Sequence, residues 1–334
     1  MKFSKLNICL TTLIFVSANA QADMLSGCSS TVYKNQAPIV SNKKLSKNNY
    51  PLCFSAFSLL FSGISKTPLW AAEYVTPEIL RKAKQISRED NFHEEEKLPV
   101  KVRSLLSDYR GSGYDRGHMV PNATRSSRID QYQSFSLANI VPQTPKNNQE
   151  QWRNVEEATR TLITKHQEPA YMITGPLFLS QKLKKIGSGV LIPTHIYKVI
   201  YFPRKQIMGA YVSVNDNIAR TDVVSVADLQ KHSGIVFFPS LQGTSVLNQR
   251  YDLPLSANAA YKMTSLRTKA GHSNIFEIMP DESAQPVSVK QSRSNKKQIR
   301  DYSYEDVVRK VSNANKEQLK QDIKNINLIF GNSK

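Results

Sequence analysis

The sequence predicts an α+β fold with a central antiparallel sheet flanked by helices. Two apolar stretches of strand length follow each other near residue 60, and strong strand patterns recur between residues 170 and 214. One long helical pattern lies between these groups. With 334 residues and 40% apolar side chains, the chain can build a large core. This composition excludes collagen-like, disulfide-dense and wholly disordered proteins.

The N-terminus has the pattern of a secretory signal. Lys2 and Lys5 precede an apolar stretch, and Ala18-Asn19-Ala20 forms a small-x-small cleavage site. We therefore expect residues 1–20 to be a signal peptide and the protein to be periplasmic or secreted. The apolar stretch is too short to span a bilayer as a helix, and no later stretch is long enough.

Residues 21–50 are polar and predict an irregular N-terminal lead-in. Cleavage of the signal removes Cys9 and leaves Cys28 and Cys53, an even number in an exported chain. A disulfide bond between them is the favoured interpretation, because oxidising compartments preserve such bonds. Leu25-Ser26-Gly27-Cys28 also resembles a lipoprotein box, which would instead place a lipid on Cys28.

The next segments predict a meander that enters a sheet. Strands are expected at residues 53–61 and 68–75, and Pro77 suits the first position of a following helix. Residues 90–99 are charged and loop-like. Residues 100–146 contain many Gly, Pro, Ser and Asn, and so long an irregular stretch in a compact domain usually carries function.

A clear helix is expected from about residue 149 to 166. Asn147 or Asn148 can cap it, and Glu150 completes a capping box with Asn147. Beyond it, the pattern predicts strands at residues 170–174, 194–202 and 208–214, a short helix at 226–231, and an end to the core near Phe237-Phe238-Pro239.

Residues 285–334 differ in composition and predict a basic, partly helical extension. They carry a net charge of +6 and a broken amphipathic pattern. A solvated or packing appendage is the favoured interpretation, and a contact with nucleic acid or membrane is the alternative.

The charge of the chain indicates a polyanionic partner. The 45 Lys and Arg residues exceed the 27 Asp and Glu residues by 18, and loss of the signal lysines lowers this excess to 16. Nucleic acid and anionic membrane both fit such a surface. The charge therefore limits the class of partner to polyanions but does not identify a reaction.

The search for catalytic chemistry leads to a histidine. Gly-Lys-Ser/Thr phosphate loops, Gly-x-Ser-x-Gly, His-Glu-x-x-His and Cys-x-x-Cys are all absent from the sequence. His118 stands out because Arg116 and Gly117 precede it. In an extended segment Arg116 and His118 face the same side. A guanidinium that holds a phosphate and an imidazole that takes a proton from water are sufficient to hydrolyse a phosphodiester.

A second set of polar residues lies on the predicted long helix. Asn148, Trp152 and Glu156 are four residues apart and would share one face. An amide oxygen and a carboxylate there could hold Mg²⁺, which keeps several of its waters. Each also has a structural interpretation: Asn148 as the cap, Trp152 in the core, and Glu156 paired with Arg153 or Arg160.

Taken together, these segments resemble the DNA/RNA non-specific endonuclease family, which includes the endonuclease G type. The resemblance rests on Asp115-Arg116-Gly117-His118, on residues 137–143 (LANIVPQ), and on Asn148-Gln149 followed by Glu156. It covers roughly residues 50–245. It implies the ββα-metal fold for a nuclease domain at residues 51–284, with an irregular active-site region.

The resemblance also implies a role for each matched residue. His118 would be the general base, and Arg116 would stabilise the charge on the phosphate. Asn148 would be the direct ligand of Mg²⁺, or of Mn²⁺ in its place, and Glu156 would orient water bound to that ion. Asn139 would position the phosphate or tune the site. The family's further basic phosphate contact has only candidates here, Arg103 and Arg110.

The implied function is an exported, Mg²⁺-dependent endonuclease that cuts DNA and RNA and leaves 5′-phosphates. The family's dimers make a homodimer compatible with the chain. A catalytically silent nucleic-acid-binding protein on the same fold is the alternative, and a basic membrane-surface protein is a third. Among the other candidates, His195 is expected in the core, His93 on the surface, and Tyr114 in packing.

Overall fold

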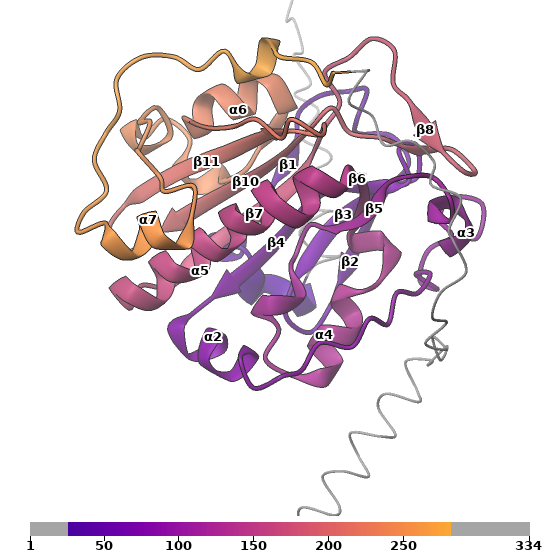
Figure 1. Cartoon of the computed structure of the whole chain (residues 1–334), viewed down its shortest axis with the longest axis horizontal. Coiled ribbons are helices and arrows are strands. Elements are labelled where there is room, and N and C mark those ends of the chain that lie inside the picture. Colours follow the sequence, from indigo (N-terminus) through magenta and orange to yellow (C-terminus); the bar gives the residue numbers. More distant parts are fainter. Residues whose placement is uncertain (1–25, 282–334) are drawn as a thin grey trace, which may run out of the picture.

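The computed structural model describes residues 26–281 and has a seven-stranded antiparallel sheet at its centre (Figure 1). The strand order is β12-β11-β10-β7-β4-β3-β2. The strands are β2 (Asn49–Cys53), β3 (Ser58–Ser62), β4 (Thr67–Val75), β7 (Ala170–Leu177), β10 (His195–Phe202), β11 (Ile207–Val214) and β12 (Thr221–Val224). The predicted α+β class with a central antiparallel sheet is therefore confirmed. The predicted signal peptide and basic C-terminal extension lie outside the described residues.

Two differences from the predicted strands have simple causes. The apolar stretch expected as one strand at residues 53–61 is a hairpin, because Phe54–Phe57 turn the chain between β2 and β3. The core also does not end near Pro239. Leu253, Ala260 and Phe276 remain buried, since the later chain folds back over the sheet.

Helices and turns cover both faces of the sheet. One face carries α2 (Pro77–Ala83), α5 (Arg153–His166) and α7 (Ala257–Lys262), with α5 in front of the central strands in Figure 1. The other face carries α6 (Val226–Ser233), the early 3₁₀ turns Ser26–Thr31 and Tyr33–Asn35, and a late turn at Ile275–Glu277. The alternation along β10 places Ile196, Lys198 and Ile200 under α5.

A separate two-stranded sheet forms beside the α5 face. Strands β5 (Asp115–His118) and β6 (Ile140–Gln143) pair antiparallel, with His118 opposite Ile140 and Asp115 opposite Gln143. The short helices α3 (Leu106–Tyr109) and α4 (Arg128–Ser134) and the small pair β8 (Lys185–Ile186) and β9 (Val190–Leu191) surround it. The order β5, β6, α5 is the ββα arrangement that the family resemblance implies.

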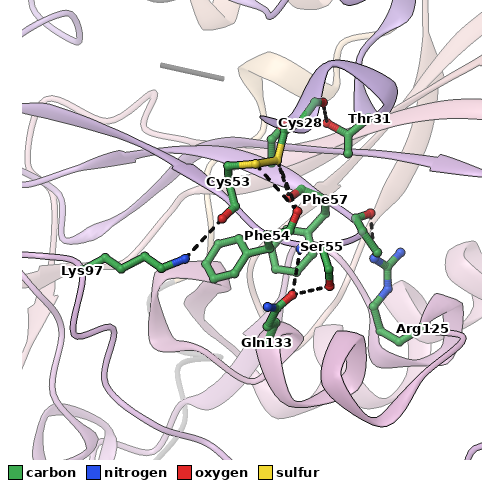
Figure 2. Close-up of a disulfide and its surroundings, with 11 residues drawn as sticks. Cys28, Thr31, Cys53, Phe54, Ser55, Phe57, Lys97, Arg125 and Gln133 are labelled. Carbon is green, nitrogen blue, oxygen red and sulfur yellow. Dashed lines mark hydrogen bonds between the residues drawn. A yellow bond between two sulfur atoms is a disulfide. The ribbon is translucent and has the colours of Figure 1, made fainter. Parts of the chain in front are cut away.

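Cys28 and Cys53 form the expected disulfide bond, with their Cα atoms 5.7 Å apart. Figure 2 shows it beside the Phe54–Phe57 turn. The bond joins the first 3₁₀ turn to the end of β2, so part of the predicted irregular lead-in packs into the fold. Tyr33 extends this packing through edge contacts with Tyr171 and Tyr201.

Three fully buried charges lie on the α5 face of the sheet. Glu73 on β4 pairs with Arg125, whose Nη1 also donates to the Ala56 carbonyl at 3.0 Å. Lys198 on β10 donates to Thr174 Oγ1 at 2.7 Å. Buried charges persist only where partners compensate the lost hydration, so this group constrains how β4, β10 and residue 125 pack.

No helix within residues 26–281 is long and apolar enough to cross a membrane.

Candidate active site

A cleft of about 530 Å³ opens between β5, the start of the long helix and the segment that precedes α3. It collects most of the residues that the sequence singled out. Its lining residues are Arg88, Phe92, Asp115, Arg116, His118, Pro121, Asn122, Ala123, Asn148, Gln149, Arg153, Glu156, Glu157 and Arg160.

Strand β5 presents Arg116 and His118 to this cleft from the same side, as their spacing predicts. Gly117 between them allows a close approach. A Cβ atom at residue 117 would lie 2.0 Å from Gln143 Oε1, a distance that atoms do not reach. Only glycine therefore fits at position 117 while Gln143 keeps its position.

His118 is held as a neutral imidazole. Its Nε2 atom is buried and has no hydrogen-bond partner among the described residues. The rings of Phe92 and Phe135 lie 5.3 Å and 4.8 Å from it, centre to centre. Burial, together with the positive charges of Arg88 and Arg116, lowers the pKa of His118 to about 3. A neutral imidazole with a free nitrogen can accept a proton.

Asn148 is oriented by the first residue of β5. Its Nδ2 donates to Asp115 Oδ2 at 2.9 Å, and Gln149 Nε2 donates to the same oxygen at 2.8 Å. Because the amide nitrogen faces Asp115, Oδ1 of Asn148 stays available as a ligand. The sequence indicated no role for Asp115 beyond its place in the motif; the structure gives it this one.

Glu156 lines the same cleft one turn into α5. Burial raises its pKa, whereas the positive charges of Lys198 and Arg160 act in the opposite direction. Arg153 pairs with Glu157 instead, with 3.8 Å between Nε and Oε1. Trp152 is fully buried and faces the sheet, as expected of a core residue.

The helix does not begin as predicted. Residues Asn147–Trp152 form a π-helical turn, the α-helix proper starts at Arg153, and no side chain caps the start. The predicted capping box of Asn147 and Glu150 is wrong. The Asn147 side chain is fully buried and bonds to Gln143 and to β11 instead.

Arg88 is the residue that sequence reasoning missed. It lies in a charged loop and lines the cleft with Arg116, and its guanidinium is 5.3 Å from the centre of the Phe135 ring. The candidates Arg103 and Arg110 are not among the lining residues. The sequence around Arg88 carries no periodic pattern that points to the cleft, and the loop it shares with Phe92, whose ring lies 4.3 Å from the Arg116 guanidinium, brings it there.

Asn139 does not reach the cleft. It is fully buried, and its amide donates to the carbonyls of Ser134 and Val120 and accepts from the Val120 amide. Direct positioning of the phosphate therefore does not fit its place, and the other expected role, tuning of the site, stays a prediction. Its contact is with the backbone just after His118, and it can affect the site only by holding that strand end.

Of the remaining candidates, His195 and Tyr114 lie where they are expected, and His93 does not. His195 is fully buried, as predicted. His93 is half-buried rather than on the surface, because its ring stacks on Tyr132 at 4.1 Å. Tyr114 packs beside the small cluster that includes Tyr109 and Ile186, as expected.

The donor set suits a hard cation. No cluster of three or more His, Cys, Asp and Glu residues that could hold a metal occurs between residues 26 and 281. The cleft instead offers the free amide oxygen of Asn148 and the carboxylate of Glu156. Oxygen donors in this small number fit an ion that keeps most of its waters, rather than zinc or another metal that prefers nitrogen and sulfur.

A histidine and arginines on a ββα unit, facing an amide and a carboxylate on its helix, define the class of metal-dependent nucleases. Residues 29–244 match the model of the DNA/RNA non-specific endonuclease family, and the chain belongs to that family. This membership confirms the family resemblance and the predicted enzyme class, a nuclease. It also indicates a divalent metal ion and a nucleic-acid substrate.

Characterised relatives agree with this assignment. The chain is 34% identical over 220 residues to the human mitochondrial nuclease EXOG, a match that covers 58% of each protein. It is 32% identical over 215 residues to human mitochondrial endonuclease G, covering 59% of this chain and 69% of that one. It is 34% identical over 192 residues to nuclease C1 of Cunninghamella echinulata var. echinulata, covering 52% and 76%.

Among solved structures, a chain in the crystal structure of the EndoG/EndoGI complex aligns with a TM-score of 0.49 and 28% identity. The alignment covers 56% of this chain and 85% of that chain.

Proposed function

We propose that the protein is an exported, Mg²⁺-dependent endonuclease that cuts DNA and RNA without sequence preference and leaves 5′-phosphates. The observation that carries the proposal is the unpartnered, buried Nε2 of His118. It faces a cleft that also holds Arg88, Arg116, Asn148 and Glu156. Contacts with phosphate carry no sequence information, which is consistent with a non-specific substrate.

In this mechanism His118 Nε2 takes the proton from the attacking water. Arg116 and Arg88 hold the phosphate oxygens, where negative charge grows in the transition state. Asn148 and Glu156 would hold Mg²⁺, or Mn²⁺ in its place, the first by direct contact. When bound, the ion would neutralise the charge that develops on the leaving 3′ oxygen.

The low pKa of His118 fits this role. A base must be neutral before it can accept a proton, and burial beside two arginines keeps the imidazole neutral well below pH 6.5. A bound phosphate brings negative charge next to the ring. That charge raises the proton affinity of His118 when the reaction needs it.

The test is a digest of supercoiled plasmid and of folded RNA, side by side, with Mg²⁺, with Mn²⁺ and with EDTA. We expect both substrates to be degraded with either ion, no cleavage in EDTA, and products that a ligase can rejoin because they carry 5′-phosphates. Equal cleavage in EDTA would contradict the metal dependence. Binding without cleavage would favour the catalytically silent nucleic-acid-binding protein.

Export and assembly are part of the proposal. Residues 1–20 support export to the periplasm or the medium, and the Cys28–Cys53 disulfide bond suits an oxidising compartment. N-terminal sequencing of the protein from fractionated cells tests the first point. Light scattering of the purified protein tests the homodimer.

A further inference from the structure

The starting observation is that the two candidate ion-holding residues lie eight positions apart on one helix. In a regular α-helix, eight residues turn through about 800°, so Asn148 and Glu156 would differ by about 80° around the axis. Both line one cleft. The π-helical turn at Asn147–Trp152 brings their directions closer than a regular α-helix would, because its wider turn rotates each residue by less.

A π turn needs support, because it is rarer than an α turn and no side chain caps this one. The support comes from Asn147, which is fully buried. Its Nδ2 donates to Ser213 Oγ at 2.7 Å and to the Val214 carbonyl at 2.8 Å, both on β11. Its Oδ1 accepts from Gln143 Nε2. The first residue of the turn is thus fixed to the central sheet.

The other partner, Gln143, ties the same turn to the strand of the general base. It is fully buried at the end of β6, and its side chain occupies the space that a side chain at residue 117 would need. The paired strands β5 and β6 therefore each meet the π turn. Asp115 of β5 accepts from Asn148, and Gln143 of β6 donates to Asn147.

We propose that Asn147, together with Gln143, is a positioning residue that holds the π turn, so that the Asn148 oxygen and the Glu156 carboxylate face the same ion. This inference rests on the proposed function. Without the buried amide pair, the start of the helix loses its anchor to β11 and to β6. Asn148 then turns away from Glu156, and the affinity for the ion falls while the rest of the fold remains.

The test uses Asn147→Leu, which keeps the size of the side chain and removes its three hydrogen bonds. Mn²⁺ alone is the probe, and its binding to the full chain is measured by titration calorimetry. We expect the Mn²⁺ dissociation constant to rise at least about ten-fold, as for other residues that orient ligands. The Mg²⁺ concentration that gives half-maximal cleavage should rise by a similar factor, whereas the KM for plasmid at saturating Mg²⁺ should change less than about three-fold.

Asn49→Leu is the matched control, because it makes the same substitution on edge strand β2. There it removes one hydrogen bond, from Asn49 Nδ2 to the Leu45 carbonyl. Its Mn²⁺ affinity should equal that of the wild type. If Asn147→Leu does not fold, Gln143→Leu removes the same pair from the other side and gives the readout. Native binding of Mn²⁺ by either folded variant would overturn the inference.

The variant Asn148→Ala distinguishes a failure of this inference from a failure of the proposed function. If Asn148→Ala also binds Mn²⁺ like the wild type, Asn148 is not a ligand and the proposed function fails at that point. If Asn148→Ala weakens Mn²⁺ binding and Asn147→Leu does not, only the positioning role of Asn147 is wrong.

Discussion

Two histidines, His118 and His195, are buried in different regions of this protein. Burial lowers the pKa of His118 to about 3 and that of His195 to about 4. Yet their surroundings differ. Nε2 of His195 donates to the Ile275 carbonyl at 3.1 Å, and its Nδ1 lies 3.0 Å from Thr194 Oγ1. Nε2 of His118 has no such partner among residues 26–281 and faces a cleft.

The comparison teaches that a lowered pKa does not identify a catalytic base. Both rings are neutral because charge is costly where water is excluded. Nε2 of His195 is occupied in holding the late turn Ile275–Glu277 against the sheet, whereas Nε2 of His118 has no partner among residues 26–281 and is available for the proposed role as a base. The partner of each nitrogen, rather than its pKa, separates the two roles.

The largest expected effect is on catalysis by His118→Ala. Removing the proposed base should lower kcat at least about 1,000-fold while DNA binding persists, because the arginines proposed to hold phosphate remain. His195→Ala is the matched substitution and should keep kcat within about three-fold per folded molecule. Cleavage rates and gel shifts on both variants measure this. Comparable losses of kcat in the two variants would erase the distinction between the regions.

Next in size is the effect of the arginines that accompany each histidine. Arg88→Ala should lower kcat/KM about 100-fold, because it removes one charge from the phosphate site. Arg220 lies near His195, where it pairs with Asp216 at 2.8 Å, and Arg220→Ala should change kcat/KM less than about three-fold. Steady-state kinetics at constant ionic strength decides the point. An Arg88 variant as active as the Arg220 variant would remove Arg88 from the site.

For the free energy of unfolding we expect the larger effect from His195→Ala and the smaller one from His118→Ala. His195→Ala leaves the Ile275 carbonyl without its donor and opens a cavity, so the free energy of unfolding should fall by about 2–3 kcal/mol. His118→Ala breaks no hydrogen bond of Nε2 and should cost less. Urea unfolding of both variants at pH 7 checks the order. A greater loss in His118→Ala would mean that the cleft depends on its ring for packing.

The smallest effect is the pH dependence of stability. In the unfolded chain each histidine has a pKa near 6.5, and in the folded chain both values are lowered. Between pH 6.5 and about 4 the unfolded state therefore binds protons that the folded state does not. Stability is fully present above pH 6.5 and falls as the pH drops, by on the order of 1–2 kcal/mol per histidine from pH 7 to pH 5.

Unfolding measured at pH 7 and pH 5 tests this for the wild type and for His195→Gln. The variant lacks one of the two histidines that take up a proton on unfolding, so its stability should fall less on acidification. An equal loss in both proteins would show that His195 is already protonated in the folded state at pH 5.

The sheet was predictable because its signal is local. Strands such as β10 and β11 are rich in apolar residues, and this pattern within a few residues is sufficient to predict a strand. The β2–β3 hairpin was missed because Phe54–Phe57 turn the chain without a single Gly or Pro. The core beyond Pro239 was missed because Leu253 and Phe276 lie in short segments with no periodic pattern.

The candidate site likewise contains residues whose placement follows from the local sequence and residues whose placement does not. Arg116 and His118 lie two apart in one strand, so their common direction follows from their spacing. Arg88 joins them from a loop 28 positions earlier, a distance over which no periodic pattern extends. The bonds of Asn147 to β6 and β11 were not predicted, because a buried asparagine with such partners has the same local sequence as a helix cap.

Gly117 has a consequence for how this protein can change over time. The Gln143 side chain occupies the space that a side chain at residue 117 would need, so residue 117 cannot change while Gln143 keeps its position. Any descendant that acquires a side chain at 117 must first shorten residue 143, and it then loses the partner of Asn147 as well. Residue 117 can therefore vary only after residue 143 has become shorter, whereas residue 143 can vary while residue 117 remains glycine.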